Sequence, residues 1–152
     1  MAQRILIMGL PGAGKTTLAS AVRERLWQQG RTVNWFNADV VRQHYNDWDF
    51  SHEGRVRQSQ RMRELADAAT TDYVIADFVA PLNAMRNTFD ADWTVWVDTI
   101  QQSRFADTDV MFIPPTSSEY DFRVTEQDAD HWANIIVAQL VSVPTQMEMN
   151  LE

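Results

Sequence analysis

The sequence predicts an α/β fold in which a mostly parallel sheet of about five strands is flanked by helices, giving three layers. Short apolar runs rich in β-branched residues alternate with amphipathic stretches of helical length. The first of these runs leads directly into a glycine-rich loop. Because 152 residues with a hydrophobic fraction of 45% can bury a sizeable core, we expect a single domain over residues 1–152.

Composition excludes several classes of function. A net charge of −8 argues against a broad nucleic-acid-binding surface, although a local basic pocket for a small anion fits it. The absence of cysteine excludes disulfides and thiolate metal sites and is consistent with a cytoplasmic location. The apolar run over residues 5–10 is too short for a membrane span or a signal-peptide core, and we expect no membrane partner. A homodimer is left open, and residues 143–152 look like a loose tail.

Residues 9–17 read G-L-P-G-A-G-K-T-T and match the Walker A pattern G-x-x-x-x-G-K-T. Glycines bring backbone N–H groups close to phosphate oxygens, Lys15 reaches the β- and γ-phosphates, and the Thr16 hydroxyl lies where Mg²⁺ needs a ligand. The motif predicts a three-layer P-loop NTPase or kinase fold with ATP and Mg²⁺ as cofactors. We expect ATP to contact the whole run: Gly9, Leu10, Pro11, Gly12, Ala13, Gly14, Lys15, Thr16 and Thr17.

The flanks of this loop have the required pattern. Residues 4–8 form a short apolar run that suits a strand buried on both faces. After the loop, Leu18, Val22 and Leu26 recur at four-residue spacing, which predicts an amphipathic helix that ends near Gly30. A strand, a phosphate loop and a helix therefore follow one another, with the helix N-terminus facing the bound anion.

A second strand is expected over residues 32–36, followed by Asp39 and Arg42 on one face of a helical turn. In open α/β sheets, ligands bind beyond the carboxyl ends of the strands. Asp39 could orient or deprotonate an attacking hydroxyl or hold Mg²⁺, and Arg42 could pair with an anionic substrate. The alternative is that Asp39 caps the helix and Arg42 is its surface partner.

A helix is expected from His52 to about Thr70, and its first half is rich in arginine. Arg55, Arg57, Arg61 and Arg63 cannot all point the same way. A solvated helix face is the better interpretation for some of these four residues, while the others concentrate positive charge locally.

The third strand is expected over residues 73–78 and carries Asp77 near its end as a possible Walker B-type acid. Asp39 and Asp77 are alternative candidates for the main acid on the Mg²⁺ side of the site, and the sequence leaves that choice open. Pro81 is expected to open a short helix.

The fourth strand, residues 93–98, precedes a polar segment over residues 99–107 that we interpret as a lid. Arg104 could close over the phosphates as a catalytic group, or it could be an ordinary loop arginine. Lid closure would also exclude water from the transfer.

Beyond a turn-rich break at residues 114–118, a fifth strand is expected over residues 120–124. The last helix is expected over residues 126–140 and covers one face of the sheet. The side chains expected to point inward are those of Trp132, Ile135, Ile136 and Leu140.

These residues resemble the adenylyl-sulfate kinase (APS kinase) family of P-loop kinases over most of the chain, to about Thr125. The phosphate loop is close to the family's G-L-S-G-A-G-K-S-T, and residues 37–42 (N-A-D-V-V-R) are similar to its D-G-D-N-V-R. Phe50-Ser51, then Arg55-Val56 and Arg61, resemble F-S followed by D-R-V-E-N-I-R-R. Residues 77–81 (D-F-V-A-P) are like S-F-I-S-P, and residues 94–99 are like the strand before the family's lid.

The resemblance implies an ATP-dependent kinase that phosphorylates the ribose 3′-hydroxyl of adenosine 5′-phosphosulfate, a step of sulfate assimilation. From the motif, the strand ends and the lid segment, the catalytic candidates are Lys15, Asp39 and Arg104, and the metal candidates are Thr16, Asp39 and Asp77. The residues implied in acceptor binding are Asp39, Arg42, Phe50, Arg55, Gln58, Phe78 and Val79.

The chain departs from the family pattern at three places. Asn37 replaces the first acid of D-G-D-N-V-R, Gln58 falls on the asparagine of D-R-V-E-N, and the R-D-P-K-G-L-Y run of the lid is absent. The acceptor therefore stays open between adenosine 5′-phosphosulfate and another small hydroxyl compound, such as a nucleoside, a nucleotide or a hydroxymethylated base. A nucleotide-gated switch or binding module is the alternative outside enzymes.

Overall fold

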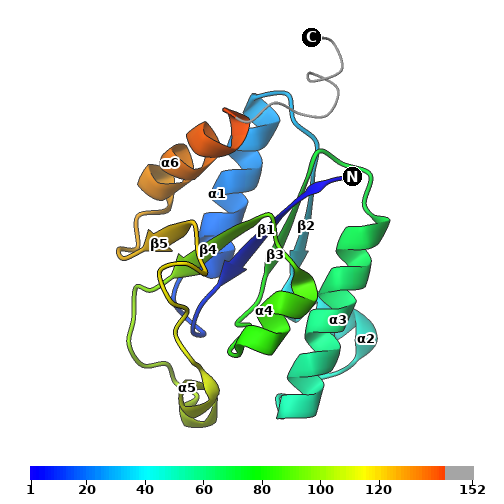
Figure 1. Cartoon of the computed structure of the whole chain (residues 1–152), viewed down its shortest axis with the longest axis vertical. Helices are drawn as coiled ribbons and strands as arrows, with labels where there is room; N and C mark the ends of the chain where they lie inside the picture. The colour runs from blue at the N-terminus through cyan, green and yellow to red at the C-terminus, as the bar shows by residue number, and fades with distance from the viewer. Residues whose placement is uncertain (143–152) are drawn as a thin grey trace.

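The computed structural model of the protein describes residues 1–142 and contains one five-stranded sheet with the order β2-β3-β1-β4-β5 (Figure 1). All neighbouring strands pair in parallel, which confirms the predicted α/β class. The strands are β1 (Gln3–Met8), β2 (Val33–Asn37), β3 (Tyr73–Asp77), β4 (Trp93–Val97) and β5 (Phe122–Val124). The predicted tail at residues 143–152 lies outside the described part of the chain.

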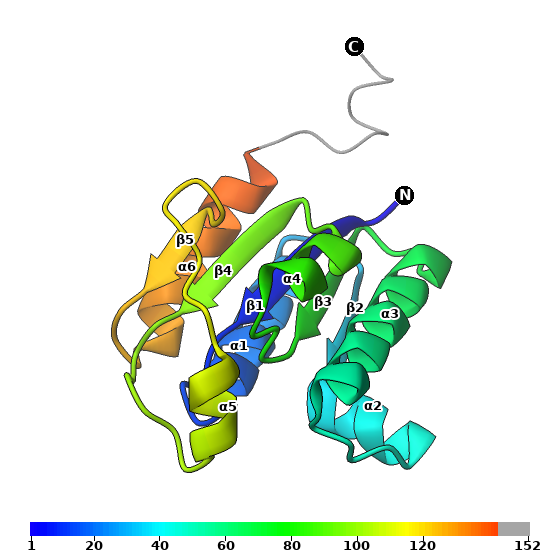
Figure 2. The same ribbon diagram turned by 60° about the horizontal axis from the view of Figure 1, so that its bottom comes forward.

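Helices cover both faces of the sheet and one of its edges (Figures 1 and 2). The helices of the described residues are α1 (Lys15–Gln28), α2 (Ala38–Tyr45), α3 (His52–Ala68), α4 (Asn83–Phe89), α5 (Ala106–Met111) and α6 (Ala129–Val141). Helices α1 and α6 lie on one face, and α3 and α4 lie on the other. Both α2 and α5 lie near the edge where the strands end. None of the helices within residues 1–142 has the length and apolarity needed to cross a membrane.

A hydrophobic core lies on each face of the sheet, and the alternation of side chains along β1 explains why both form. Ile5 and Ile7 are fully buried with the inner residues of α1 and α6, whereas Leu6 and Met8 are buried with those of α3. Successive side chains of a strand point to opposite faces, so a continuous apolar run requires cover on both sides. The uninterrupted run at residues 4–8 was thus a correct indicator of a central strand.

The first helix follows the prediction closely. Leu18, Val22 and Leu26 are all buried in the core between α1 and the sheet. After the C-cap Gln29, Gly30 has a φ of 76° and its N–H donates to the carbonyl of Trp27. A left-handed residue at this position lets the chain leave the helix and turn toward β2.

The last helix was predicted too early and with one wrong inward residue. It begins at Ala129, with Asp128 as its N-cap, rather than at residue 126. Ile135 is 41% exposed, so its predicted inward position is wrong. The buried residues of α6 are Ala133, Ile136, Val137 and Leu140, which follow the i, i+3, i+4, i+7 spacing of one helix face. Ile135 lies one residue off that face.

One prediction about a short helix is wrong, and a second short helix was not predicted. Pro81 does not open α4, because the helix begins at Asn83 with Leu82 as its N-cap. Residues 106–111 form α5, which overlaps the end of the segment interpreted as a lid and for which the sequence analysis made no prediction. Asp107 and Asp109 lie in the first turn of α5, where negative charge favours the helix dipole. Six residues are too few for a helical period to be visible in the sequence.

Because the strands are parallel, their carboxyl ends meet at one edge. Asn37 at the end of β2 is paired in register with Asp77 at the end of β3, and Ile7 of β1 is also in register with Asp77. The phosphate loop leaves β1 one residue later, and α2 begins directly after β2. The fold thereby brings residues far apart in sequence to one edge of the sheet.

Candidate functional site

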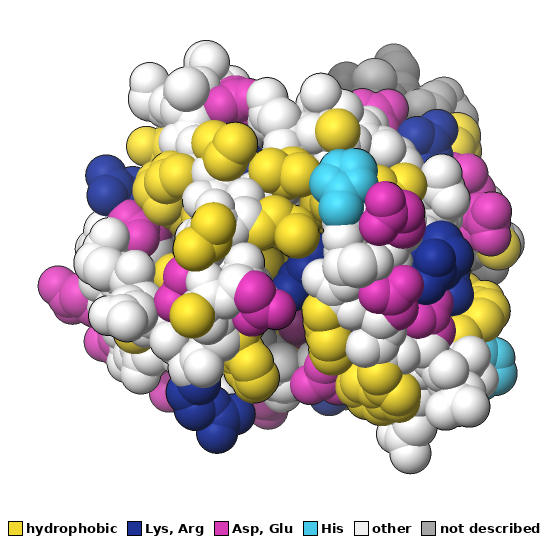
Figure 3. Space-filling view, turned by 90° about the horizontal axis from the view of Figure 1, so that it is seen from below, with side chains coloured by type: hydrophobic (Ala, Val, Ile, Leu, Met, Phe, Trp, Pro, Cys, Tyr) yellow, Lys and Arg dark blue, Asp and Glu magenta, His cyan; other side chains and the backbone are white. Residues whose placement is uncertain are grey.

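A cavity of about 510 Å³ opens at this edge of the sheet. Viewed from below in Figure 3, the molecule is hollowed between two lobes, and basic side chains are visible inside the hollow. The cavity is bounded by the phosphate loop, α2, the start of α3, the segment after β3, and α5. Its lining residues are Pro11, Gly12, Gly14, Lys15, Thr16, Thr17, Asn37, Ala38, Asp39, Arg42, Phe50, Arg55, Gln58, Asp77, Phe78, Val79, Ala80, Pro81, Met85, Arg104, Phe105, Asp107 and Thr108.

Most of the residues predicted from the sequence lie in this one cavity. Gly9, Leu10 and Ala13 of the loop are the exceptions, because they lie behind its cavity-facing side. The lining side chains include four cations and three carboxylates, in a chain whose net charge is −8. The cavity is therefore locally cationic, as a binding site for anionic groups requires.

The phosphate loop is shaped by its packing against the sheet. A side chain at Gly9 would place its Cβ 2.4 Å from the carbonyl oxygen of Val97 in β4, so only glycine fits there. The loop ends at Gly14, the N-cap of α1, and the first backbone N–H groups of α1 begin at Lys15. These N–H groups have no partner within the helix and are available to an anion.

Lys15 is a buried cation that has no anionic partner within residues 1–142. Its side chain donates from Nζ to the carbonyl of Leu10 at 2.9 Å, and no ion pair among residues 1–142 includes it. Burial lowers the pKa of Lys15 to about 8, and the charges of Asp77 and Asp39 offset only part of this effect. A bound phosphate would supply the missing counter-charge and favour the protonated amine.

Asp77 lies at the bottom of the cavity, beside the Thr16 hydroxyl. The hydroxyl donates to Oδ1 of Asp77 at 3.4 Å, the Asn37 amide donates to both groups, and the Trp35 indole donates to Oδ2 of Asp77 at 2.7 Å. Burial raises the pKa of Asp77, although these hydrogen bonds and the charge of Lys15 oppose the shift. A desolvated carboxylate beside a hydroxyl is a set of hard oxygen donors that a divalent cation would satisfy.

Asp39 lies in a different environment. It is exposed on the first turn of α2, and no described residue donates a hydrogen bond to its carboxylate. The cap of α2 is Asn37, whose side-chain oxygen accepts from the backbone N–H groups of Asp39 and Val40. The alternative in which Asp39 caps the helix is thus wrong, and its carboxylate is free to meet an incoming ligand.

Arg42 and Arg55 form the opposite wall of the cavity and are 3% and 8% exposed. The guanidinium carbons lie 4.4 and 5.4 Å from the ring centre of Phe50. Their neutral partners are the carbonyls of residues 47, 49 and 50 and the Thr108 hydroxyl. Neither arginine is in an ion pair with a carboxylate of the described residues, and burial lowers the pKa of both.

The other arginines of α3 do not line the cavity. Arg57 and Arg61 pair with Asp47, and Arg63 pairs with Asp67. Gln58 does line it and donates to the carbonyl of Ala38 at 3.2 Å. The interpretation of some α3 arginines as a solvated set is therefore confirmed for Arg57 and Arg63, whereas the side chain of Arg61 is only 16% exposed.

Two further segments, around Phe78 and around Arg104, complete the walls of the cavity. Phe78 is buried against Phe89, with ring centres 5.9 Å apart, and Val79 follows it along the cavity. Arg104 is an exposed side chain at the cavity, 5.5 Å from the ring centre of its neighbour Phe105. The turn that carries Arg104 is fixed because Ser103 donates from its N–H and hydroxyl to the Asp109 carboxylate.

Sequence reasoning missed Trp35 and Thr108. Trp35 lies two residues before Asn37 on the same strand, and alternation puts both on one face, so this signal was available. Thr108 gives Arg55 its shortest hydrogen bond, at 2.7 Å, but it lies on the helix that the sequence did not reveal. No local pattern connects it with a residue of α3.

Comparison with known proteins places these features in a family. The family model described as adenylylsulphate kinase matches residues 1–107. An adenylyl-sulfate kinase of Halothermothrix orenii is 36% identical over 83 residues, which cover 53% of this chain and 45% of that relative. The chain thus spans less than half the length of the curated relatives it matches.

Solved structures agree at the level of fold. The Mycobacterium tuberculosis APS kinase CysC, in complex with AMPPNP and APS, superposes with a TM-score of 0.76 at 20% identity, covering 92% of this chain and 98% of that one. A shikimate kinase of Acinetobacter baumannii, in complex with shikimate, has a TM-score of 0.63 at 18% identity, covering 92% and 94%. The predicted P-loop kinase fold is therefore confirmed, and chains of this fold differ in the compounds bound to them.

Proposed function

The chain belongs to the adenylylsulphate kinase family, and on that premise we propose that it transfers the γ-phosphoryl group of ATP to a hydroxyl of a small anionic nucleotide-like compound. Adenosine 5′-phosphosulfate is the first candidate for this acceptor. The observation that carries the proposal is the pair of buried guanidinium groups, Arg42 and Arg55, which line the same cavity as the phosphate loop and have no carboxylate partner among the described residues. Two such groups are suited to the charged end of an anionic acceptor.

On the donor side, the chain's own groups position ATP. The amides at the start of α1 and the Lys15 ammonium hold the β- and γ-phosphates and neutralise the charge that develops there. Phosphoryl transfer asks for little covalent chemistry from the protein, so positioning and charge account for most of the catalysis. Arg104 approaches the transferred group from the α5 side and helps to exclude water when the segment over residues 99–107 closes.

Mg²⁺ fits the geometry around Thr16 and Asp77. Their side-chain oxygens are 3.4 Å apart, and no group of three or more His, Cys, Asp or Glu that could hold a metal exists among residues 1–142. An ion there would take its remaining ligands from phosphate oxygens and water, as Mg²⁺ does in nucleotide sites. Thr16 and Asp77 would hold the ion, which would supply positive charge to offset that of the phosphates. Trp35 and Asn37 hold the Asp77 carboxylate in place for this role.

On the acceptor side, Asp39 is the group that would accept the hydroxyl proton or orient the hydroxyl. It is solvent-exposed at the cavity and lies on the same helix as Arg42. An acceptor whose anionic group rests on Arg42 and Arg55 would bring its hydroxyl between Asp39 and the γ-phosphate. Phe50, Phe78 and Val79 offer apolar surface to the rest of the acceptor.

The direct test measures ADP release from Mg-ATP with and without adenosine 5′-phosphosulfate. We expect the acceptor to stimulate ADP release strongly and a 3′-phosphorylated product to accumulate in equal amount. Binding of ATP without stimulation would contradict the proposed acceptor. A screen of nucleosides, nucleotides and modified bases would then identify the compound that does stimulate release.

The different surroundings of Asp77 and Asp39 predict separable losses of function. Asp77→Asn removes the charge beside Thr16. We therefore expect weaker binding of Mn²⁺–ADP, measured by electron paramagnetic resonance, and a turnover lowered by about 10²- to 10³-fold. Asp39→Asn should lower turnover by about 10²- to 10⁴-fold and leave Mn²⁺–ADP binding unchanged. The reverse pattern, with metal binding lost only in Asp39→Asn, would exchange the two roles.

Three sequence-based expectations are kept as part of this proposal. Residues 1–152 act as a single kinase domain, the protein is cytoplasmic, and it is able to form a homodimer. No broad nucleic-acid surface is expected, in keeping with the net charge of −8.

A further inference from the structure

Arg42 and Arg55 form one wall of the cavity, called the acceptor wall below. This wall depends on the segment over residues 46–51, which connects α2 to α3. The Nη1 of Arg42 donates to the backbone carbonyls of Asp47 and Asp49, at 3.0 and 3.1 Å. The next residue, Phe50, stacks its ring against the Arg42 guanidinium, and its carbonyl accepts a hydrogen bond from Nε of Arg55. The positions of both cavity arginines are thus set by the backbone of this segment, so any group that fixes the segment also fixes the wall.

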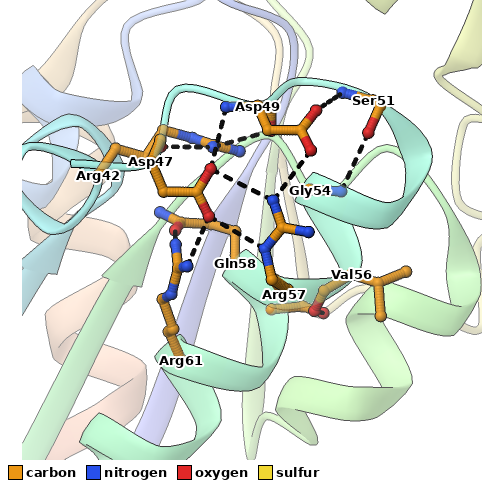
Figure 4. Close-up of polar contacts among 10 residues, drawn as sticks. Arg42, Asp47, Asp49, Ser51, Gly54, Val56, Arg57, Gln58 and Arg61 are labelled. Atoms are coloured by element: carbon orange, nitrogen blue, oxygen red, sulfur yellow. Dashed lines mark hydrogen bonds and ion pairs between the residues drawn. The ribbon is translucent and has the colours of Figure 1, made fainter. Parts of the chain in front are cut away.

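One side chain outside the cavity ties the two aspartates of this segment together. Arg57 donates from Nε and Nη2 to the Asp47 carboxylate, at 3.1 and 3.3 Å, and from Nη2 to Asp49 at 2.9 Å. In Figure 4, Arg57 lies between Asp47 and Asp49, and dashed lines join it to both. Arg61 is the second arginine on the Asp47 carboxylate, at 2.5 Å, whereas the carboxylate of Asp49 receives no other arginine among the described residues.

The helix surface below the segment is built to receive it. Asp49 packs directly on Gly54, where an added Cβ would lie 2.0 Å from the Asp49 carbonyl oxygen and 2.6 Å from its carboxyl carbon. Inside the segment, the carboxylate of Asp47 accepts from the N–H of Asp49, and the carboxylate of Asp49 accepts from the N–H of Ser51. The two carboxylates therefore shape the backbone while Arg57 holds them from outside.

We propose that Arg57 is a positioning residue of the acceptor site, which acts through Asp47 and Asp49 to hold Arg42 and Phe50 in place. It does not line the cavity, and its side chain is 45% exposed. The inference rests on the proposed function in one respect, namely that the Arg42 side of the cavity binds the acceptor. Its effect is expected on acceptor affinity and not on ATP.

The chain offers a matched control on the same helix. Arg63 has a similarly exposed side chain, at 41%, and its Nε donates to both carboxylate oxygens of Asp67 at 3.2 and 3.3 Å. Exposed ion pairs of this kind contribute little to global stability, so Arg57→Gln and Arg63→Gln should both fold. They differ in what the arginine holds, because of these two arginines Arg57 contacts the segment over residues 46–51 and Arg63 contacts Asp67 and the Thr88 carbonyl.

The experiment combines calorimetric binding of adenosine 5′-phosphosulfate in the presence of ADP with amide hydrogen exchange of the ligand-free protein. In Arg57→Gln, we expect about tenfold weaker acceptor binding, because a small displacement of the wall misplaces its charges. The amides of Asp49 and Ser51 should exchange about tenfold faster, since local opening becomes easier. Arg63→Gln should match wild type in both measurements, and Arg57→Lys should recover part of the loss.

Equal behaviour of Arg57→Gln and Arg63→Gln would overturn the inference and make Arg57 an ordinary surface residue. Faster exchange in Arg57→Gln without weaker acceptor binding would also overturn it, because the wall would then tolerate a loosened segment. If the wild type binds adenosine 5′-phosphosulfate but does not phosphorylate it, the proposed function fails and the binding comparison still decides the role of Arg57. If the wild type does not bind it, the proposed acceptor fails, and equal exchange of Asp49 and Ser51 in the two variants would overturn the inference as well.

Discussion

Replacing Lys15 with alanine is expected to lower ADP release by at least about 10³-fold while residues 1–142 keep their fold. Lys15 is the cation at the phosphate loop, and its only hydrogen bond among the described residues is to the carbonyl of Leu10. Burial lowers its pKa to about 8, from 10.5, so the charged amine costs stability at neutral pH. Removing it should not lower the midpoint of thermal unfolding, measured by circular dichroism.

The sign of this stability effect follows from the two pKa values. Below about pH 8 the amine is protonated in both states, and the full cost of its burial is present. Between pH 8 and 10.5 the unfolded chain binds more protons, so the native protein gains stability as pH rises. The gain should be missing in Lys15→Ala.

Lys15 is also convenient to observe, because it is the only lysine in the sequence. Methylation with a ¹³C-labelled group therefore gives a single side-chain signal in NMR, and its titration reports this residue alone. Lys15→Arg is the control for charge, and we expect it to be inactive too, because a planar guanidinium does not replace a compact ammonium on a flexible stem. Unchanged phosphoryl transfer in Lys15→Ala would contradict the assignment of the phosphate loop.

The phosphate loop was predictable because all of its chemistry lies within nine consecutive residues, flanked by a readable strand and helix. The choice between Asp39 and Asp77 was not, because both follow strands whose ends share an edge. What separates them is burial: Asp77 is 2% exposed and bonded to Trp35, whereas Asp39 is open to solvent. Burial is a property of the assembled fold and has no local signature.

The arginines of α3 illustrate the same limit. Residues two positions apart in a helix are separated by about 200° around its axis, so Arg55 and Arg57 must point in nearly opposite directions. The sequence shows that they differ but not which of them lines the cavity. That depends on Asp47, which attracts Arg57 and Arg61, and on Thr108, which meets Arg55 from α5. These contacts join residues up to 53 positions apart.

Arg55→Ala is expected to raise the KM for the acceptor by about 10- to 150-fold, which corresponds to the 1.5–3 kcal/mol of a hydrogen bond to a charged group. Arg55 is 8% exposed, and its guanidinium is held by the Phe50 carbonyl and the Thr108 hydroxyl, so it is already in place before a ligand arrives. The measurement is ADP release at varied acceptor and fixed saturating ATP, then at varied ATP. Arg63→Ala, on the same helix, serves as the control for loss of an arginine.

The KM for ATP should not rise in Arg55→Ala, and the reason is electrostatic. Burial is the main cause that lowers the pKa of Lys15, and the positive charge of Arg55 lowers it slightly further. Removing it favours the protonated form of Lys15, which is the form that binds phosphate. A variant with weaker acceptor binding and unimpaired ATP binding would place Arg55 on the acceptor side alone. An equal rise in both constants would instead mean that Arg55 supports the cavity as a whole, and the two-sided division of the site would then be wrong.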